Sequence, residues 1–267
     1  MNRRPRAPIA LLTDFGTRDW YVAAVKGVIL SKCPEARLID ITHEVPPQDI
    51  VSGAFILAAA AAWFPAGTVF LAVVDPGVGS QRALLAVYAD GRYFVGPDNG
   101  LLSLSVSRAK ALRIIRLTNR RYWLSSVSQT FQGRDVLAPV AAYLAGGGSF
   151  TRLGVAAHEM VPLELPAVQK RGRVYLGQVS HIDAFGNLVT NLPGRMAAAC
   201  LREAGARVIL RYKDQKARVV SSYVAGRPNE LVAVIGSLGL IELAIREGSA
   251  AWAYHAKRGD QVELLPG

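Results

Sequence analysis

The stretch TVFLAVVDPGVGSQR, residues 68–82, decides the fold of the first part of this chain. From Val69 to Val74 it is apolar, partly β-branched and without alternation, a pattern typical of a strand buried on both faces of a mostly parallel sheet. The run stops at Asp75, and the Pro-Gly-Val-Gly residues that follow favour a turn. Because ligands of open α/β sheets bind at the carboxyl ends of the strands, we expect Asp75 at the mouth of a site. Arg82 is near enough in sequence to meet it across the loop.

A purely structural interpretation of this loop is equally open, with Asp75 ending a turn and Arg82 on the surface. The glycines at 77 and 79 lack the third glycine of a dinucleotide-binding loop, and no Gly-Lys-Ser/Thr of a P-loop follows them. Both of those phosphate-binding motifs are therefore excluded here.

The residues before this stretch repeat the pattern of strand and helix. Ile9–Leu12 is a short apolar run that also ends at an acid, Asp14. Helical spacing over 19–30 and 50–63, with a strand-like run at 37–41 between them, completes the order β-α-β-loop-α-β. That order predicts a parallel sheet with right-handed crossovers.

The residues after it predict a change of architecture. A strand pair at 83–88 and 92–95 and a helix at 136–144, capped by Asp135, precede a linker at Pro162–Pro166. Beyond the linker the apolar runs are short and separated by turns, as in an all-β domain. The sequence therefore predicts an N-terminal α/β domain over 1–162, a mostly parallel sheet flanked by helices, and a smaller C-terminal all-β domain over 168–267.

The composition bounds the possible partners and locations. The chain has 267 residues and a formal charge of +11, but its basic residues are scattered and no nucleic-acid-binding motif accompanies them, so nucleic acid is an unlikely partner. The apolar region 51–74 is interrupted by Phe-Pro-Ala-Gly-Thr and does not predict a membrane span. The basic start has too short an apolar run for a signal peptide. We therefore expect a cytoplasmic protein without membrane contact.

The cysteines and histidines predict neither a disulfide nor a metal site. Cys33 and Cys200 stand far apart without metal-type spacing and are interpreted as buried thiols. The four histidines form no paired pattern.

Two stretches of the second half carry groups that bind ligands. HIDAFGN, residues 181–187, combines an acid, an aromatic ring, a glycine and an amide; GSLG, residues 236–239, and GSAA, residues 248–251, offer small residues and free backbone donors. Ordinary turns and close packing explain these stretches equally well.

Seven blocks, taken in order, resemble the S-adenosylmethionine hydroxide adenosyltransferase family, relatives of the fluorinase and chlorinase. They are TDFGTRDWYVAAVKG, DITHEVPPQDIVSGAFIL, FPAGTVFLAVVDPGVGSQR, YFVGPDNGLLS, TFQGRDVLAPVAAYLA, IDAFGNLVTNL and GSLGLIELAIREGSAA. The resemblance covers nearly the whole chain. It implies hydrolysis of S-adenosyl-L-methionine (SAM) to adenosine and methionine, with SAM as substrate and no cofactor. It also implies a homotrimer whose sites lie between the first domain of one subunit and the second domain of its neighbour.

The same resemblance implies roles for individual residues. Asp75 and Arg82 match two members of a catalytic Asp-Arg-His set, and Asp14 matches the acid that holds the ribose hydroxyls. The other substrate-binding positions implied by the family are Tyr21, Asp183, Phe185, Asn187, Ser237, Leu238, Ala250 and Ala251. One position departs: where the family commonly has TFHGRD this chain has TFQGRD, so Gln132 replaces the histidine. Glutamine cannot take up a proton near neutral pH.

Three functions follow from these residues. The first is SAM hydrolysis, for which we hypothesise that Gln132 positions water in place of the histidine. Halide-dependent adenosyl transfer is the second, and the carboxylate of Asp75 opposes it because it repels an anion. The third is a SAM- or adenosine-binding protein with weak or lost turnover, which Gln132 motivates. Methyl transfer is disfavoured because no glycine-rich loop follows the first strand.

Overall fold

The computed structural model describes residues 6–204 and 207–267 of the chain. Two compact units make up the chain, Met1–Glu164 and Leu165–Gly267. Their division falls inside the predicted linker at Pro162–Pro166. The first residues of the basic N-terminal start, 1–5, lie outside the described part.

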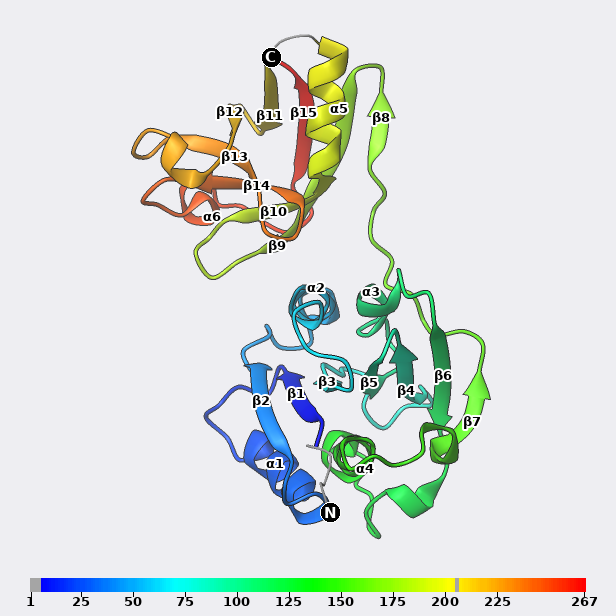
Figure 1. Ribbon diagram of the computed structural model, residues 1–267. Coiled ribbons are helices and arrows are strands. Elements are labelled where there is room, and N and C mark those ends of the chain that lie inside the picture. The colour runs from blue at the N-terminus through cyan, green and yellow to red at the C-terminus, as the bar shows by residue number, and fades with distance from the viewer. Residues whose placement is uncertain (1–5, 205–206) are drawn as a thin grey trace. The chain divides into compact units, whose positions relative to one another are not determined.

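The N-terminal unit is built on a seven-stranded mixed sheet in the order β2-β1-β3-β5-β4-β6-β7 (Figure 1). Its strands are β1 (Pro8–Thr13), β2 (Arg37–Thr42), β3 (Val69–Val73), β4 (Leu84–Ala89), β5 (Arg92–Pro97), β6 (Leu112–Leu117) and β7 (Gly154–Ala157). The half β2-β1-β3-β5 is parallel, whereas β4, β6 and β7 pair antiparallel. The predicted α/β class is confirmed, and so is the hairpin of β4 and β5 at Asp90-Gly91, where both residues have positive φ.

Helices cover both faces of this sheet (Figure 1). Helices α1 (Tyr21–Lys32) and α4 (Ala138–Ala145) pack together on one face, and α2 (Ile50–Ala61) and α3 (Ser103–Val106) pack together on the other. Asp49 caps α2 by accepting a hydrogen bond from the Ser52 amide at 3.1 Å. The small side chains of α2 and α4 let both helices approach the strands closely; β1 and β3 are fully buried, whereas the edge strand β2 is largely exposed.

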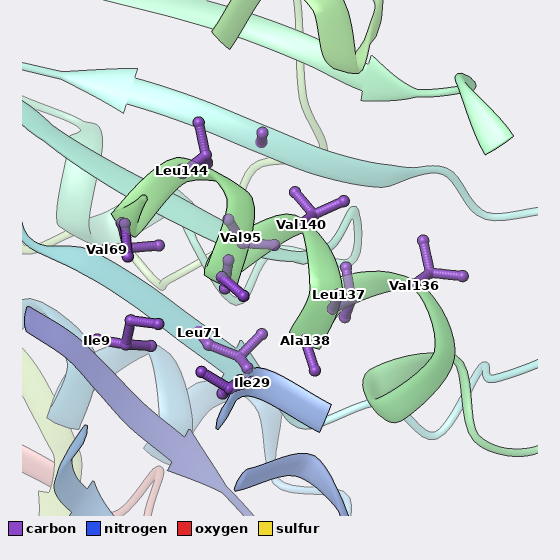
Figure 2. Packing of buried hydrophobic residues seen from close by; sticks show 14 of the residues in the cluster. Ile9, Ile29, Val69, Leu71, Val95, Val136, Leu137, Ala138, Val140 and Leu144 are labelled. Carbon is purple, nitrogen blue, oxygen red and sulfur yellow. The ribbon is translucent and has the colours of Figure 1, made fainter. Parts of the chain in front are cut away.

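The strand that leads to Asp75 lies at the centre of this packing. All five residues of β3 are buried. Figure 2 shows the apolar side chains of the helical segment 136–144 packed over β1, β3 and β5; its labelled residues are Ile9, Ile29, Val69, Leu71, Val95, Val136, Leu137, Ala138, Val140 and Leu144. Truncating a fully buried leucine such as Leu71 to alanine costs about 2–5 kcal/mol. The carboxyl end of β3 is therefore a rigid platform.

A wide helical turn precedes α4 and corrects one expectation. Residues Gly133–Leu137 form a π-helical turn, η2, that runs into α4. Asp135 does not cap the helix as predicted, because it lies fully buried inside this turn. Its carboxylate accepts hydrogen bonds from the Ser128 amide at 2.7 Å and from Arg134 Nε at 2.6 Å. Asp135 thus ties segment 128–130 to the start of the helix.

The C-terminal unit is a closed barrel of short strands, which confirms the predicted β domain. Its sheet has the order β10-β14-β13-β12-β11-β15-β9-β8, and an additional pairing of β10 with β9 closes the ring. The strands are β8 (Gln169–Arg171), β9 (Val174–Ile182), β10 (Leu188–Pro193), β11 (Val208–Tyr212), β12 (Gln215–Val220), β13 (Leu231–Ile235), β14 (Leu240–Ile245) and β15 (Gln261–Pro266). Closure removes unpaired strand edges from the ring.

Helix α5 (Gly194–Ala204) is an element of this unit that the all-β interpretation did not predict. Ala197 and Cys200, one turn apart, are buried in the core of the barrel unit. Arg195 and Arg202 are exposed on its other face, so the helical periodicity is present in the sequence and was passed over. The unit is therefore a β barrel with one amphipathic helix, and a further single turn, α6 (Ala250–Ala253), follows β14.

The prediction of buried thiols is met by the described residues. Cys33 and Cys200 are buried free thiols. Within 6–204 and 207–267, no helix combines the length and the apolarity needed to cross a bilayer.

Candidate active site

Asp75 and Arg82 form a buried ion pair at the carboxyl end of β3. Arg82 Nε donates to Asp75 Oδ1 at 2.6 Å, and Arg82 Nη2 donates to Asp75 Oδ2. Only 7% of the Asp75 side chain and 9% of the Arg82 side chain are exposed. Arg82 therefore does return across the loop, and the alternative of a surface arginine does not hold. Two parallel hydrogen bonds from one guanidinium fix both the position and the plane of the carboxylate.

The loop between these two residues requires glycine at position 79. Gly79 has a φ of +84°, and a Cβ placed on it would lie 2.9 Å from the carbonyl oxygen of Gln129. Any other residue would meet backbone strain and a clash with segment 128–130. This close approach brings the loop after β3 against the segment that leads to η2.

Gln132 completes a cluster of three residues. Its Oε1 accepts a hydrogen bond from Arg82 Nη2 at 2.9 Å, the same nitrogen that donates to Asp75. Among the described residues, none accepts a hydrogen bond from the Gln132 amide nitrogen. The next residue, Gly133, is buried, and a Cβ there would lie 3.3 Å from Val73 at the end of β3. The structure therefore brings Asp75, Arg82 and Gln132 together from three places in the sequence.

Asp14 leaves the neighbouring strand at the same edge of the sheet. Thr13, the last residue of β1, is the register partner of Val73 in β3, so Asp14 and Asp75 emerge side by side. Asp14 Oδ2 accepts a hydrogen bond from the Gln48 amide at 2.8 Å. Its Oδ1 receives no hydrogen bond from the part of the chain that the structure describes. One oxygen of Asp14 thus anchors the carboxylate, and the other is left without a hydrogen-bond donor among the described residues.

Tyr21 belongs to an aromatic cluster next to this edge. The ring of Phe131 lies edge-on to Phe15, Trp20 and Tyr21, with centroids 5.7, 5.6 and 5.3 Å apart. Trp20 and Tyr21 stack at 4.6 Å and remain 56% and 39% exposed. Sequence reasoning missed Trp20 and Phe131, although their positions inside two family-like blocks mark them. Trp20 and Tyr21 give this cluster an exposed surface, whereas Phe131, the residue before Gln132, is buried.

In the C-terminal unit, Asp183, Phe185 and Asn187 lie in one turn between β9 and β10. Asp183 Oδ1 accepts from the amides of Phe185 and Asn187 at 2.9 and 2.8 Å, and its Oδ2 accepts from Asn187 Nδ2 at 2.9 Å. The turn therefore holds its own carboxylate in a fixed direction. It also presents the ring of Phe185, which is 80% exposed.

The loop that carries Ala250 and Ala251 is joined to this turn. The Ala251 amide donates to the Gly186 carbonyl at 2.9 Å, and Ala250 is fully buried in the barrel core. Trp252, the next residue, is 80% exposed. The described loop thus places two exposed rings, Phe185 and Trp252, on adjoining segments.

Ser237 and Leu238 form the turn between β13 and β14, at the opposite end of β14 from Ala250 and Ala251. The turn lies on the buried Glu242: a Cβ on Gly236 would lie 1.7 Å from Glu242 Oε1. Burial raises the pKa of Glu242, whereas the hydrogen bond from Tyr223 OH at 2.9 Å lowers it and the charge of Asp183 raises it further. Burial and Glu242 raise the pKa of Tyr223 to about 12. The tyrosine therefore stays a neutral donor.

The described residues contain no group of three or more histidine, cysteine, aspartate or glutamate side chains in a metal-binding arrangement.

Comparison with known proteins connects both units to one family. The model of the SAM hydroxide adenosyltransferase N-terminal domain matches residues 9–154, and that of the C-terminal domain matches residues 177–263. A protein of Salinispora tropica named (R)-S-adenosyl-L-methionine hydrolase is 37% identical, over 98% of this chain and 99% of its own length. A protein of the same name from Thermus thermophilus is 38% identical, over 97% and 99%.

More distant and structural relatives agree. A fluorinase of an Actinoplanes species is 27% identical over 96% of each chain. The crystal structure of an uncharacterised conserved protein of Thermotoga maritima superposes with a TM-score of 0.90 at 34% identity, covering 96% of this chain and 99% of that one. With domain models matched in order along both units and relatives of such identity over almost its full length, this chain belongs to the S-adenosylmethionine hydroxide adenosyltransferase family.

Proposed function

We propose that this protein hydrolyses SAM to adenosine and L-methionine by attack of water on the ribose 5′ carbon. The observation that carries the proposal is the cluster of Asp75, Arg82 and Gln132 at the carboxyl end of β3. It offers a fixed carboxylate and a fixed amide at a sheet edge where α/β proteins bind ligands. The names of the relatives of similar length support the same reaction.

The reaction needs no general acid. The oxygen of water forms a bond to the 5′ carbon while the carbon–sulfur bond breaks, and its electron pair stays on sulfur as the neutral thioether of methionine. Such a leaving group needs no proton. The positive charge of the sulfonium shifts onto the attacking oxygen and leaves as the proton that the water loses. The protein must therefore align the water opposite the carbon–sulfur bond and exclude other solvent.

We assign the alignment of water to Asp75 and Gln132. Arg82 holds both acceptor groups through one nitrogen, so that the carboxylate and the amide keep a constant separation. The carboxylate accepts a hydrogen bond from the water and takes or relays its proton. Gln132 holds the water by a hydrogen bond from its free amide nitrogen. In this role a glutamine substitutes for a histidine without proton transfer.

The residues that we assign to substrate binding lie in both units. We propose that Asp14 Oδ1 accepts hydrogen bonds from the ribose hydroxyls and that Tyr21 lies against the bound nucleoside. In the C-terminal unit we assign Asp183 and Asn187 to polar groups of SAM. Phe185 and the backbone near Ala250 and Ala251 are assigned to the adenine side. Ser237 and Leu238, at the other end of β14, receive the methionine carboxylate. SAM is substrate here, and we propose no cofactor.

We further propose a cytoplasmic homotrimer in which each site joins the N-terminal unit of one subunit to the C-terminal unit of its neighbour. The 80% exposure of Phe185 and of Trp252 supports a covering partner, because large apolar rings rarely stay in water without a function. The two free thiols agree with a reducing compartment. Co-expressing Asp75→Ala with Asp183→Ala tests the shared site: random mixing should restore about a quarter of the sites in a closed ring. No recovery would exclude it.

The test of the reaction is incubation of the protein with SAM, with and without chloride or fluoride, followed by chromatography. Equal amounts of adenosine and methionine, indifferent to halide and lost in Asp75→Asn, would support the hydrolase. A halogenated adenosine product would establish adenosyl transfer to halide instead. Binding of SAM without any product would support the binding protein that Gln132 motivates.

A further inference from the structure

Beneath the Asp14 loop lies a chain of four polar side chains from four different segments. Lys26 Nζ on α1 donates to Asp40 Oδ2 on β2 at 2.6 Å, and Asp40 Oδ1 meets His43 Nε2 at 3.0 Å. On its other side, His43 Nδ1 meets Thr13 Oγ1 at 2.8 Å. His43 and Thr13 are 5% and 1% exposed, whereas Asp40 and Lys26 reach solvent. The function proposed above uses none of these four groups.

The direction of each hydrogen bond follows from the chemistry of the partners. Burial raises the pKa of Asp40, but hydrogen bonds from Lys26 and His43 outweigh it and hold that pKa below its ordinary value. The carboxylate is therefore an acceptor, and His43 Nε2 carries the proton that it receives. Thr13 Oγ1 also accepts from the Phe15 amide at 3.3 Å and lies 2.8 Å from His43 Nδ1, so it joins the imidazole to the backbone after Asp14. The chain is continuous from Lys26 to the backbone on the far side of Asp14.

His43 also begins the loop that holds the Asp14 carboxylate. Its carbonyl accepts from the Gly16 amide at 2.8 Å, and five residues later Gln48, with a φ of +65°, donates its amide to Asp14 Oδ2 at 2.8 Å. Between these bonds the Val45 amide reaches the Thr13 carbonyl at 3.4 Å. The segment that precedes Asp14 and the segment that orients it are thus joined through the His43 side chain and backbone.

We propose that His43, acting through Thr13, is a positioning residue that sets the direction of the Asp14 carboxylate and so the recognition of the ribose hydroxyls. The inference rests on the proposed function, since it assigns Asp14 to the ribose. Asp14 is only partly buried and lies in a loop. A hydrogen bond on each flank, Phe15 to Thr13 and Gln48 to Asp14, replaces the rigidity that a strand would give it.

Matched variants of Thr13 test this series of hydrogen bonds without removing the buried imidazole of His43. Thr13→Val keeps the shape and deletes the hydroxyl, whereas Thr13→Ser keeps the hydroxyl and deletes a methyl group. His43→Asn interrupts the series of hydrogen bonds at a second point, and Asp40→Asn interrupts it at a third, partly exposed position. The probes are adenosine and 2′,3′-dideoxyadenosine, which lacks the hydroxyls that Asp14 would bind, with affinities measured by calorimetry.

In Thr13→Val we expect the Kd for adenosine to rise about tenfold, which corresponds to about 1.4 kcal/mol. The Kd for dideoxyadenosine should change by less than about twofold, and Thr13→Ser should bind both as the wild type does. With SAM, KM should rise more than kcat falls. His43→Asn should follow Thr13→Val, and neither should add to the loss that Asp14→Asn causes alone, because residues acting through one group are not additive.

Equal losses for both nucleosides would mean a merely structural role and would overturn the inference, as would unchanged adenosine binding in Thr13→Val and His43→Asn. A wild type that binds adenosine but forms none from SAM would contradict the proposed hydrolysis. The affinities of the variants for adenosine and dideoxyadenosine would still decide the inference about His43. If the wild type binds neither nucleoside, the inference about His43 fails, and the product assay with SAM decides the proposed hydrolysis.

Discussion

Arg82 donates two hydrogen bonds to Asp75, from Nε to Oδ1 and from Nη2 to Oδ2, and Nη2 also donates to the side-chain oxygen of Gln132. One planar guanidinium therefore positions both acceptor groups, and a substitution at Arg82 removes the support of Asp75 and of Gln132 together. This coupling decides what each substitution below should do.

Lysine at position 82 should not replace arginine. Its ammonium keeps the charge but cannot donate to both oxygens of Asp75 and to Gln132 in one plane. We expect Arg82→Lys to lower kcat about a hundredfold by misplacing the water, with a smaller change in KM. Arg218→Lys is the matched control, since Arg218 donates to Glu230 with Nε and Nη2 in the C-terminal unit and its side chain is 50% exposed. Steady-state kinetics of both variants would decide, and an Arg82→Lys enzyme with wild-type kcat would refute the alignment role.

Restoring the histidine of the family should change little. If Gln132 only positions water, Gln132→His should alter kcat by less than about tenfold, far below the effect of a general base. Gln132→Leu should lose activity because it removes the acceptor of Arg82 Nη2 and the free amide. A gain of about a hundredfold or more in Gln132→His would show that a base is missing from this chain.

Alanine at position 79 should harm the enzyme more than alanine at position 147. The two glycines have φ values of +84° and +86°. A Cβ on Gly79 would meet a backbone oxygen, whereas a Cβ on Gly147 would have no described atom within 4 Å. The backbone strain alone costs about 1–2 kcal/mol in either variant. Gly79→Ala should add a steric shift of the Asp75–Arg82 loop and lower kcat, which thermal melts and kinetics of the two variants would separate. Equal effects on both measurements would contradict this role of the loop.

The buried Glu242 should make stability depend on pH with a definite sign. Its pKa is raised in the folded protein from an ordinary 4.5, so the native state holds this proton more tightly than the unfolded chain. The stabilisation is complete below the ordinary value and is lost as pH rises through the raised value. Glu242→Gln keeps an acceptor for Tyr223 and cannot ionise. We expect it to be more stable than the wild type at neutral pH, with the difference shrinking on acidification.

Glu230 provides the opposite case for the same experiment. Hydrogen bonds from the Arg227 backbone and from Arg218 hold its pKa below the ordinary value, so its contribution is present at neutral pH and lost as pH falls. Urea unfolding of Glu242→Gln and Glu230→Gln across the acid range should therefore give differences of opposite sign. The same sign in both would contradict the assignment of burial as the dominant cause at Glu242.

The strand, the turn and the acid of residues 68–82 could be predicted because apolar runs and glycines act locally. The pairing of Arg82 with Asp75 also followed from a short separation along one loop. Local sequence could not show that the side-chain carbonyl of Gln132 turns to Arg82, since fifty residues separate them. Local sequence also could not show that the Asp183 carboxylate accepts hydrogen bonds from amides of its own turn, because these bonds depend on the path of the backbone.

Two helical features were missed for different reasons. Helix α5 does carry helical periodicity in sequence, with Arg195 and Arg202 exposed and Ala197 and Cys200 buried, but the all-β interpretation of the second half left no place for a helix. Asp135 has the spacing of a cap, but the wide turn places it one step inside the helix. Only in this second case did tertiary contacts override the local pattern.

The wide turn at Gly133–Leu137 is a place where this helix can change length without disturbing the cluster before it. A π-helical turn holds one residue more than an α-helical turn. Deleting one residue there would convert its hydrogen bonds from five residues apart to four and would leave the flanking segments in phase. Gln132 would keep its direction toward Arg82, whereas the same deletion in the regular helix that follows would rotate it by about 100°. The turn thus confines a change in chain length to one place, next to the cluster and without cost to its geometry.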